Sequence, residues 1–273
     1  MDTGSEVDKS GGRMSEDRVL ALEGVHNFRD YGGYSTAGGG RLRRGVLWRS
    51  GQHHGASEAD LERIGSLGLV AVFDLRSHRE RASHPCRRPA SFAARVVHAP
   101  DPAEHSAPHI AAARVTRQRT AESTREGLLQ NYTKIAFRPE LQAMMAQLIT
   151  AVASGEGPTL VNCMAGKDRT GLAVAMVQFA AGVHRDDVLE DYLLTNTAGD
   201  VEARIAAGAA TIRTMAGEID EAALRVLMGV EAEYLETALL AIEAEYGSLD
   251  SYMSDALGAG PAVCAKLRDA VVA

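Results

Sequence analysis

Residues 160–171 read Leu-Val-Asn-Cys-Met-Ala-Gly-Lys-Asp-Arg-Thr-Gly, and this stretch says more about the fold than any other part of the chain. The apolar residues before Cys163 predict a short buried strand over 159–162. Gly166 marks a turn. The apolar run after Arg169 predicts a helix over 170–181, which ends at Gly182, a suitable residue for a helix C-terminus. The chain therefore passes from a strand through a tight loop into a helix.

This loop has the chemistry of an anion site. Successive backbone N–H groups are expected to converge at the start of the helix, where the dipole also favours negative charge. The same field favours the thiolate form of a cysteine. Arg169 follows Cys163 after five intervening residues, and its planar guanidinium can hold two oxygens of a phosphoryl group. The pattern predicts attack by Cys163 on phosphorus, with substrate contacts from the loop residues Met164, Ala165, Gly166 and Lys167.

Two other interpretations of the loop are open. Cys163 can be an inert core cysteine, the usual state of a buried thiol. The pair Gly166-Lys167 is also found in nucleotide-binding loops, but that pattern requires Ser or Thr where this chain has Asp168, and glycine where it has Val161.

The rest of the chain predicts an α/β fold. Further strands are expected over 19–22, 47–50, 69–75 and 95–98, and helices over 58–67, from Pro139 onward, from Asp186 onward, and over 202–215, 221–228, 231–245 and 248–257. Strands alternate with helices in the first two-thirds, and helices alone fill the last third, an order typical of α/β proteins.

We predict one catalytic domain over residues 18–273, preceded by a disordered tail over 1–17 that has almost nothing to bury. Residues 100–130 contain few large apolar side chains and form a predicted lid or mobile segment. Its arginines, Arg114, Arg117, Arg119 and Arg125, either attract an anionic substrate or form a solvated face.

Composition excludes several classes of protein. Twenty-nine basic and 36 acidic residues give a net charge of −7, which argues against a nucleic-acid partner because duplex binding needs a basic face. Three widely spaced cysteines exclude a disulfide scaffold. The N-terminal residues contain no secretory segment, and the longest apolar run, 171–183, is too short to span a membrane. We therefore expect a cytoplasmic protein, and its richness in Ala, Arg and Gly is typical of a high-GC bacterium.

The string from Cys163 to Arg169 matches the C-x5-R signature of the protein tyrosine phosphatase superfamily, and the longer string to Gly171 resembles the bacterial tyrosine/lipid phosphatase family. Further blocks resemble that family in the same order: residues 27–33, 49–51, 74–80, 191–196 and 246–248. The resemblance implies a tyrosine-phosphatase-like fold, in which helices flank a central, mostly parallel sheet. Residues 163–169 are called the phosphate loop below.

The resemblance also implies a mechanism without a metal or another cofactor. Cys163 forms a cysteinyl-phosphate that water then hydrolyses, Arg169 stabilises the charge on phosphate, and the Thr170 hydroxyl assists departure of the sulfur. The general acid of this family corresponds to Asp168. Asp74 and Asp101 are the alternatives. Asp74 and Arg76 are candidates for substrate binding, and Arg76 and Asp30 either anchor the loop or the substrate or belong to a structural ion pair.

The substrate is left open by the resemblance. A phosphotyrosine protein, or dual specificity, is the family default, Lys167 matches a lysine of phosphatases that accept phosphoinositides, and a small phosphorylated metabolite is a third possibility. The superfamily has His before the cysteine, whereas this chain has Asn162. Asn forms hydrogen bonds but carries no charge, so we expect slower turnover, or a pseudophosphatase that binds phosphate without hydrolysing it.

Overall fold

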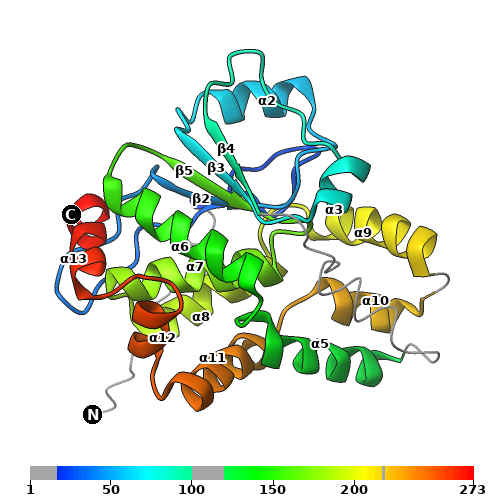
Figure 1. Cartoon of the computed structure of the whole chain (residues 1–273). Coiled ribbons are helices and arrows are strands. Elements are labelled where there is room, and N and C mark those ends of the chain that lie inside the picture. Colours follow the sequence, from blue (N-terminus) through cyan, green and yellow to red (C-terminus); the bar gives the residue numbers. More distant parts are fainter. Residues whose placement is uncertain (1–16, 100–119, 217–218) are drawn as a thin grey trace, which may run out of the picture.

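The computed structural model of the chain describes residues 17–99, 120–216 and 219–273 (Figure 1). All but the last residue of the predicted tail, most of the predicted lid, and Asp101 lie outside these residues.

A five-stranded sheet forms the centre of the fold, with the strands β1 (Arg29–Asp30), β2 (Leu47–Ser50), β3 (Ala71–Asp74), β4 (Arg95–His98) and β5 (Thr159–Asn162). Their order in the sheet is β1-β2-β5-β3-β4. Only the short β1 is antiparallel to its neighbour; β2, β5, β3 and β4 are all parallel. The predicted α/β fold with a mostly parallel sheet is confirmed.

The register of the sheet brings three loops together. Ser50 at the end of β2 and Asp74 at the end of β3 both lie opposite Asn162, the last residue of β5. The loops that leave these strands therefore emerge side by side at one edge of the sheet, which is where parallel α/β sheets form their binding sites. The central one of the three is the loop that begins at Cys163.

Helices cover both faces of this sheet: α2 (Glu58–Gly65), α3 (His78–Ser83), α5 (Ala121–Ile135), α6 (Pro139–Ser154), α7 (Asp168–Ala181), α8 (Arg185–Leu193), α9 (Val201–Ala216), α10 (Glu221–Met228), α11 (Ala232–Tyr246), α12 (Leu249–Asp255) and α13 (Pro261–Val271). Successive strand residues point to opposite faces, so Val72 and Leu160 pack in the cluster that contains α2, whereas Phe73 and Val161 pack with α6 and α7.

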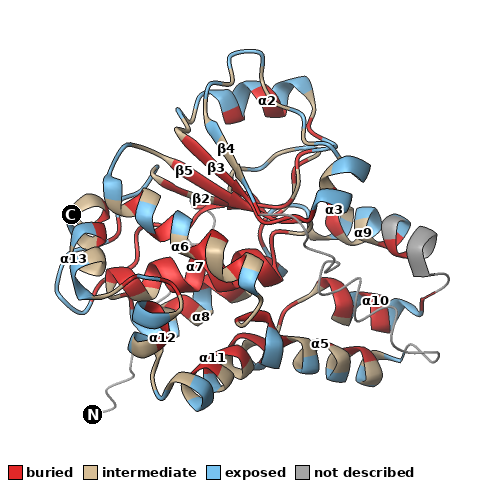
Figure 2. Cartoon of the chain, viewed as in Figure 1, coloured by how far each residue is buried: buried red, intermediate tan, exposed pale blue. Residues whose placement is uncertain are grey.

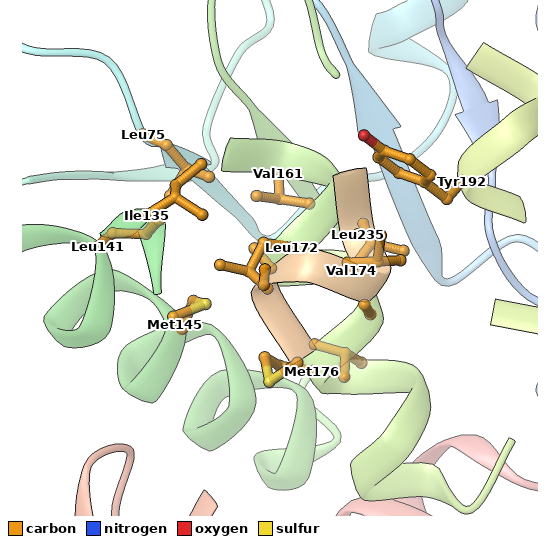
Figure 3. Packing of buried hydrophobic residues seen from close by; sticks show 14 of the residues in the cluster. Leu75, Ile135, Leu141, Met145, Val161, Leu172, Val174, Met176, Tyr192 and Leu235 are labelled. Atoms are coloured by element: carbon orange, nitrogen blue, oxygen red, sulfur yellow. The ribbon is translucent and has the colours of Figure 1, made fainter. Parts of the chain in front are cut away.

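Helix α7 lies in the middle of the larger core (Figure 2). All of its residues except Phe179 are buried, as expected for a helix that is apolar on every side. Figure 3 shows Leu172, Val174 and Met176 of α7 among Val161 of β5 and Met145 of α6. Because α7 is enclosed, the loop at its N-terminus is attached to the most rigid part of the molecule.

One predicted element is wrong, and one helix was not predicted. Residues 19–22 do not form a strand; Val19 makes one isolated bridge to Arg29, and the chain then bends because the N–H groups of Glu23 and Gly24 both bond the Asp60 carboxylate. Residues 121–130 of the predicted lid belong to helix α5, which the sequence reading missed. Its buried residues Thr124, Leu128, Tyr132 and Ile135 recur at helical spacing, and Thr120 caps its start.

Candidate active site

The phosphate loop connects β5 to α7 with Cys163 at its beginning and Arg169 in the first turn of the helix. Cys163 is a free, buried cysteine with 3% of its surface exposed. Gly166 has a left-handed backbone with φ of +67°, and a Cβ atom there would lie 2.5 Å from the Ser50 carbonyl. Both facts require glycine at this position, and they explain the sharp turn that the sequence predicted.

Neighbouring backbone and side-chain donors hold the carbonyl groups of this loop on its outer side. The Gln52 N–H donates to the Met164 carbonyl at 3.0 Å. The Asn27 amide donates to the carbonyls of Ala165 at 3.4 Å and Gly166 at 2.7 Å. Arg49 also donates to Gly166, at 3.0 Å.

The carbonyl of one residue and the N–H of the next point in opposite directions across a trans peptide. Anchoring the three carbonyls outward therefore turns the N–H groups of Ala165, Gly166 and Lys167 inward. Within the part of the chain that the structure describes, none of these three N–H groups has a hydrogen-bond partner. They form a concave set of free donors at the N-terminus of α7, an arrangement that suits an anion.

A buried network supports the outer side of the loop. Asn27 adopts a left-handed backbone with φ of 58°, and its side-chain oxygen accepts a hydrogen bond from Arg29. Arg29 and Arg49 both contact the carboxylate of Asp191, at 3.4 Å and 2.6 Å. Burial, followed by repulsion from Arg49, lowers the pKa of Arg29 to about 9. Two arginines against one carboxylate leave positive charge behind the loop.

Arg169 is fixed by Glu80 of α3. Its two terminal nitrogens donate to the two carboxylate oxygens at 2.8 Å and 2.9 Å, and one of them also donates to the Leu75 carbonyl. Burial opposes the charged form, but Glu80 and the Cys163 sulfur outweigh it and raise the pKa of Arg169. The Nε–H has no partner among the described residues, so this donor is available to a ligand.

The Thr170 hydroxyl is buried and has no hydrogen-bond partner in residues 17–99, 120–216 and 219–273. It follows Arg169 in the first turn of α7. A buried hydroxyl without a partner costs free energy, and a group on a bound ligand or a neighbouring sulfur would satisfy it.

Asp168 ends a chain of two tyrosines. The Tyr132 hydroxyl from α5 donates to Asp168 Oδ1 at 2.8 Å and lies 2.7 Å from the Tyr192 hydroxyl of α8. Burial, with repulsion from Asp168, raises the pKa of both phenols well above the ordinary value. They therefore stay neutral and hold the carboxyl group by hydrogen bonding alone.

The Lys167 side chain points toward the end of helix α10. Its ammonium is fully buried and donates to the carbonyls of Leu227 at 2.6 Å and Gly229 at 2.8 Å, at the end of α10. Burial lowers the pKa of Lys167, and Asp168, 3.5 Å away, opposes that change. Its side chain joins α10 to the phosphate loop in this structure.

Asp74 and Arg76 pair with each other. Arg76 donates to both Asp74 oxygens at 2.8 Å and 2.7 Å and also to Cys86 Sγ. The Asn162 amide donates to Asp74 at 3.3 Å, and its own oxygen has no partner among the described residues. In this structure Arg76 and Asp74 form a buried ion pair with each other.

Other candidates have structural partners. Asp30 accepts from the N–H groups of Gly32 and Gly45 and so closes a turn. Arg125 pairs with Glu231 and Glu233 of the α11 N-terminus. His53 contacts Ser50 and Arg88. Arg114, Arg117, Arg119, Asp101, His105 and His109 lie outside the described residues, among which no group of three or more His, Cys, Asp or Glu side chains could hold a metal ion.

Sequence reasoning missed several residues that hold the loop. Asn27, Arg49, Glu80 and Asp191 stand in the blocks that resemble the phosphatase family, so the blocks themselves were the available signal. Tyr132 stands in no block, because its part in the site depends on how α5 packs against α7 and α8.

Comparisons with known proteins identify the family of this chain. The sequence profile of the tyrosine phosphatase family matches residues 20–273. The triple specificity protein phosphatase PtpB of Mycobacterium tuberculosis is 32% identical over 268 residues, which cover 87% of this chain and 94% of that protein. A Cupriavidus necator protein named as a candidate tyrosine-protein phosphatase is 36% identical over 241 residues, 87% of this chain and 84% of that protein. TpbA of P. aeruginosa, a crystal structure, is 19% identical with a TM-score of 0.32 over 72% of this chain and 86% of its own. No helix of the described residues is long and apolar enough to cross a membrane.

Proposed function

Because this chain belongs to the tyrosine phosphatase family, we propose that it hydrolyses phosphate monoesters through a cysteinyl-phosphate at Cys163. In the first step the Cys163 thiolate attacks phosphorus, the S–P bond forms and the ester P–O bond breaks. Asp168 gives its proton to the departing oxygen. The N–H groups of Ala165, Gly166 and Lys167, together with Arg169 Nε–H, stabilise the charge on the three equatorial oxygens.

In the second step water attacks phosphorus and the S–P bond breaks. The Asp168 carboxylate accepts a proton from the water, and the Thr170 hydroxyl donates a hydrogen bond to the departing sulfur. Inorganic phosphate leaves, and Cys163 and Asp168 return to their starting protonation states. No metal takes part in either step.

One observation carries this proposal: in the loop that follows Cys163, three inward N–H groups and the Nε–H of a buried arginine have no partner within residues 17–99, 120–216 and 219–273. An inert core cysteine would not need such a loop. The nucleotide-site interpretation is disfavoured because Lys167, which would have to reach the phosphates, bonds backbone carbonyls instead.

Asp168 suits the role of general acid better than Asp74. Both oxygens of Asp74 accept hydrogen bonds from Arg76, so this carboxylate is engaged within β3 and the loop that follows it. Asp168 lies in the phosphate loop itself, where it accepts a hydrogen bond from Tyr132 at 2.8 Å and lies 3.5 Å from the Lys167 ammonium. We therefore assign proton transfer to Asp168 and the positioning of β3 and its loop to Asp74 and Arg76.

The substrate class we propose is phosphotyrosine protein, with dual specificity toward other phosphate esters. The support is the family itself and one relative named as a triple specificity protein phosphatase. Lys167 does not add to an argument for phosphoinositides, because its charge faces the end of α10.

Hydrolysis of 4-nitrophenyl phosphate tests the proposal. We expect turnover that is insensitive to chelator, is abolished by Cys163→Ser and is retained by Cys264→Ser, a matched change at a half-buried thiol on α13. Cys163→Ser should still bind inorganic phosphate. A panel of phosphotyrosine peptide, phosphoserine peptide, phosphoinositide vesicles and sugar phosphates then ranks the substrates.

Asn162 favours one other function, a pseudophosphatase, because its side chain cannot supply the charge of the family histidine. This alternative predicts that the wild type binds phosphate and releases no 4-nitrophenol between pH 5 and 8, while Asn162→His gains activity. Turnover by the wild type would exclude it.

A further inference from the structure

Arg204 of helix α9 is a buried cation with two guanidinium nitrogens that have no partner in the part of the chain that the structure describes. Its side chain is 2% exposed, and neither Nε nor Nη1 bonds any atom of the described residues. The other deeply buried arginines differ: Arg29, Arg49 and Arg76 each donate to a carboxylate. Removing a guanidinium from water without a partner costs free energy, and a bound anion would offset that cost.

The guanidinium lines a cavity of about 60 Å³ beside the phosphate loop. The cavity is lined by Met164 and Ala165 of the phosphate loop, by residues of α9 and α10, and by the segments around His26 and Gln52: His26, Gly51, Gln52, Met164, Ala165, Ala207, Gly208 and Met228. A space of this size holds one compact group and no extended chain. Because Met164 and Ala165 directly follow Cys163, a group in this cavity would lie next to the phosphate loop.

The charges around the cavity favour an anion. Burial lowers the pKa of Arg204 to about 10, and attraction to Asp168 opposes that change, so the guanidinium stays charged at pH 7. Burial, with repulsion from Arg204, lowers the pKa of His26. His26 is thus neutral at pH 7, and in the described part of the chain Arg204 forms no salt bridge.

We propose that Arg204 binds a second phosphate group of the substrate, and that esters with two phosphate groups are therefore hydrolysed in preference to those with one. This inference rests on the proposed phosphatase function. The first phosphate occupies the loop of Cys163 and is hydrolysed. The second, attached to the leaving group near Asp168, fills the cavity and accepts hydrogen bonds from Arg204, with the neutral His26 as a further donor.

Phenylene bisphosphates test this subsite, because their ortho, meta and para isomers hold the two phosphates at three fixed spacings. Phenyl phosphate is the matched substrate with one phosphate. Rates of phosphate release are compared between the wild type and Arg204→Met on the same compound, so differences in leaving-group reactivity cancel. We expect Arg204→Met to lower kcat/KM for at least one bisphosphate by about tenfold or more beyond its effect on kcat/KM for phenyl phosphate. This is the effect of losing one charge-assisted hydrogen bond.

Two further variants separate binding from folding. Ala207→Asp places a carboxylate at an exposed position on the cavity wall, where it can pair with Arg204, and should abolish the bisphosphate preference with the buried arginine still present. Arg225→Met removes an exposed arginine of α10 that pairs with Glu202 and Glu221 at the surface, and it should leave both rates unchanged.

The outcomes distinguish the two proposals. Absence of turnover by the wild type on every substrate overturns the phosphatase function. Turnover with equal relative rates for the wild type, Arg204→Met and Ala207→Asp overturns the subsite alone. A direct measurement accompanies the kinetics: Cys163→Ser should bind the best bisphosphate at least about tenfold more tightly than phenyl phosphate, and Arg204→Met in that background should remove the difference.

Discussion

The Asp168 carboxyl group stands at the end of a hydrogen-bonded chain from Tyr192 through Tyr132, and its role can be isolated by varying the leaving group. Asp168→Asn removes the proton donor. We expect kcat for phenyl phosphate, which has a poor leaving group, to fall by about 100-fold or more, and kcat for 4-nitrophenyl phosphate to fall much less. Steady-state kinetics with the two esters measures this.

Asp74→Asn is the matched comparison for that experiment. Its main effect should be a lower melting temperature, because it leaves Arg76 without a buried partner. If Asp74→Asn, rather than Asp168→Asn, showed the selective loss on phenyl phosphate, the assignment of the general acid would be reversed.

We expect Tyr132 to act as a positioning residue, because its hydroxyl donates a hydrogen bond to Asp168. Tyr132→Phe should lower kcat for phenyl phosphate by about tenfold with a smaller change in KM, the effect of losing one hydrogen bond to a charged or proton-donating group. If Tyr132 positions the general acid, kcat should depend more steeply on the leaving group in Tyr132→Phe than in the wild type. A purely structural role would not change this dependence. Equal losses on phenyl and 4-nitrophenyl phosphate would contradict the positioning role.

At the scale of elements, the loop between β2 and α2 carries a pH-dependent contribution to stability. His53 in this loop is fully buried between Ser50 and Arg88. Burial, reinforced by Arg88 and Arg76, lowers its pKa well below 6.5. The unfolded chain therefore binds a proton at His53 below about pH 6.5 while the folded protein does not.

The free energy of unfolding should fall as the pH drops below about 6.5, by up to about 1.4 kcal/mol per pH unit from this group. His53→Gln should make this dependence shallower, whereas His78→Asn, at an exposed position of α3, should not change it. Urea denaturation at pH 7.5, 6.5 and 5.5 gives the slopes. A slope for His53→Gln equal to that of the wild type would contradict this account.

The same scale explains what the sequence could predict. Strand β5, the loop and α7 follow from adjacent residues: an apolar run, Gly166, and a helix that ends at Gly182, so their prediction was close to the structure. Helix α5 is not evident from the sequence, because its first residues lie next to a stretch with few apolar side chains. The partners of the loop, among them Glu80, Tyr132 and Arg204, come from α3, α5 and α9, and only the packing of these helices brings them to one place.

At the scale of the whole molecule, the last residues of the chain form backbone hydrogen bonds with the segment 41–43. Ala273 exchanges two backbone hydrogen bonds with Arg41, and Val271 accepts one from Arg43, at 2.7–2.9 Å. Helix α13 thereby fixes the turn region around 35–43. This arrangement depends on residues more than 200 positions apart, which explains why no local pattern predicted it.

Deleting residues 271–273 should lower the free energy of unfolding by about 3–5 kcal/mol, from three lost hydrogen bonds and the buried Val271 side chain. Because the phosphate loop lies at the other side of the core, kcat/KM at 20 °C should stay within about twofold of the wild-type value. Val272→Thr keeps the backbone pairing and is the control for denaturation. A deletion that left the urea midpoint unchanged would show that this seam contributes nothing to stability.

Because Lys167 is buried, its chemical modification can report when helix α10 separates from the phosphate loop. An amine-selective acylating reagent needs a neutral, accessible amine, and this one is enclosed by the carbonyls of Leu227 and Gly229. Lys134 and Lys266, outside that enclosure, should be labelled at once and serve as internal standards. At reagent concentrations where acylation is faster than reclosing, the rate at which mass spectrometry detects acylated Lys167 equals the rate at which α10 separates from the loop, so that a motion of the fold can be timed by an ordinary chemical modification.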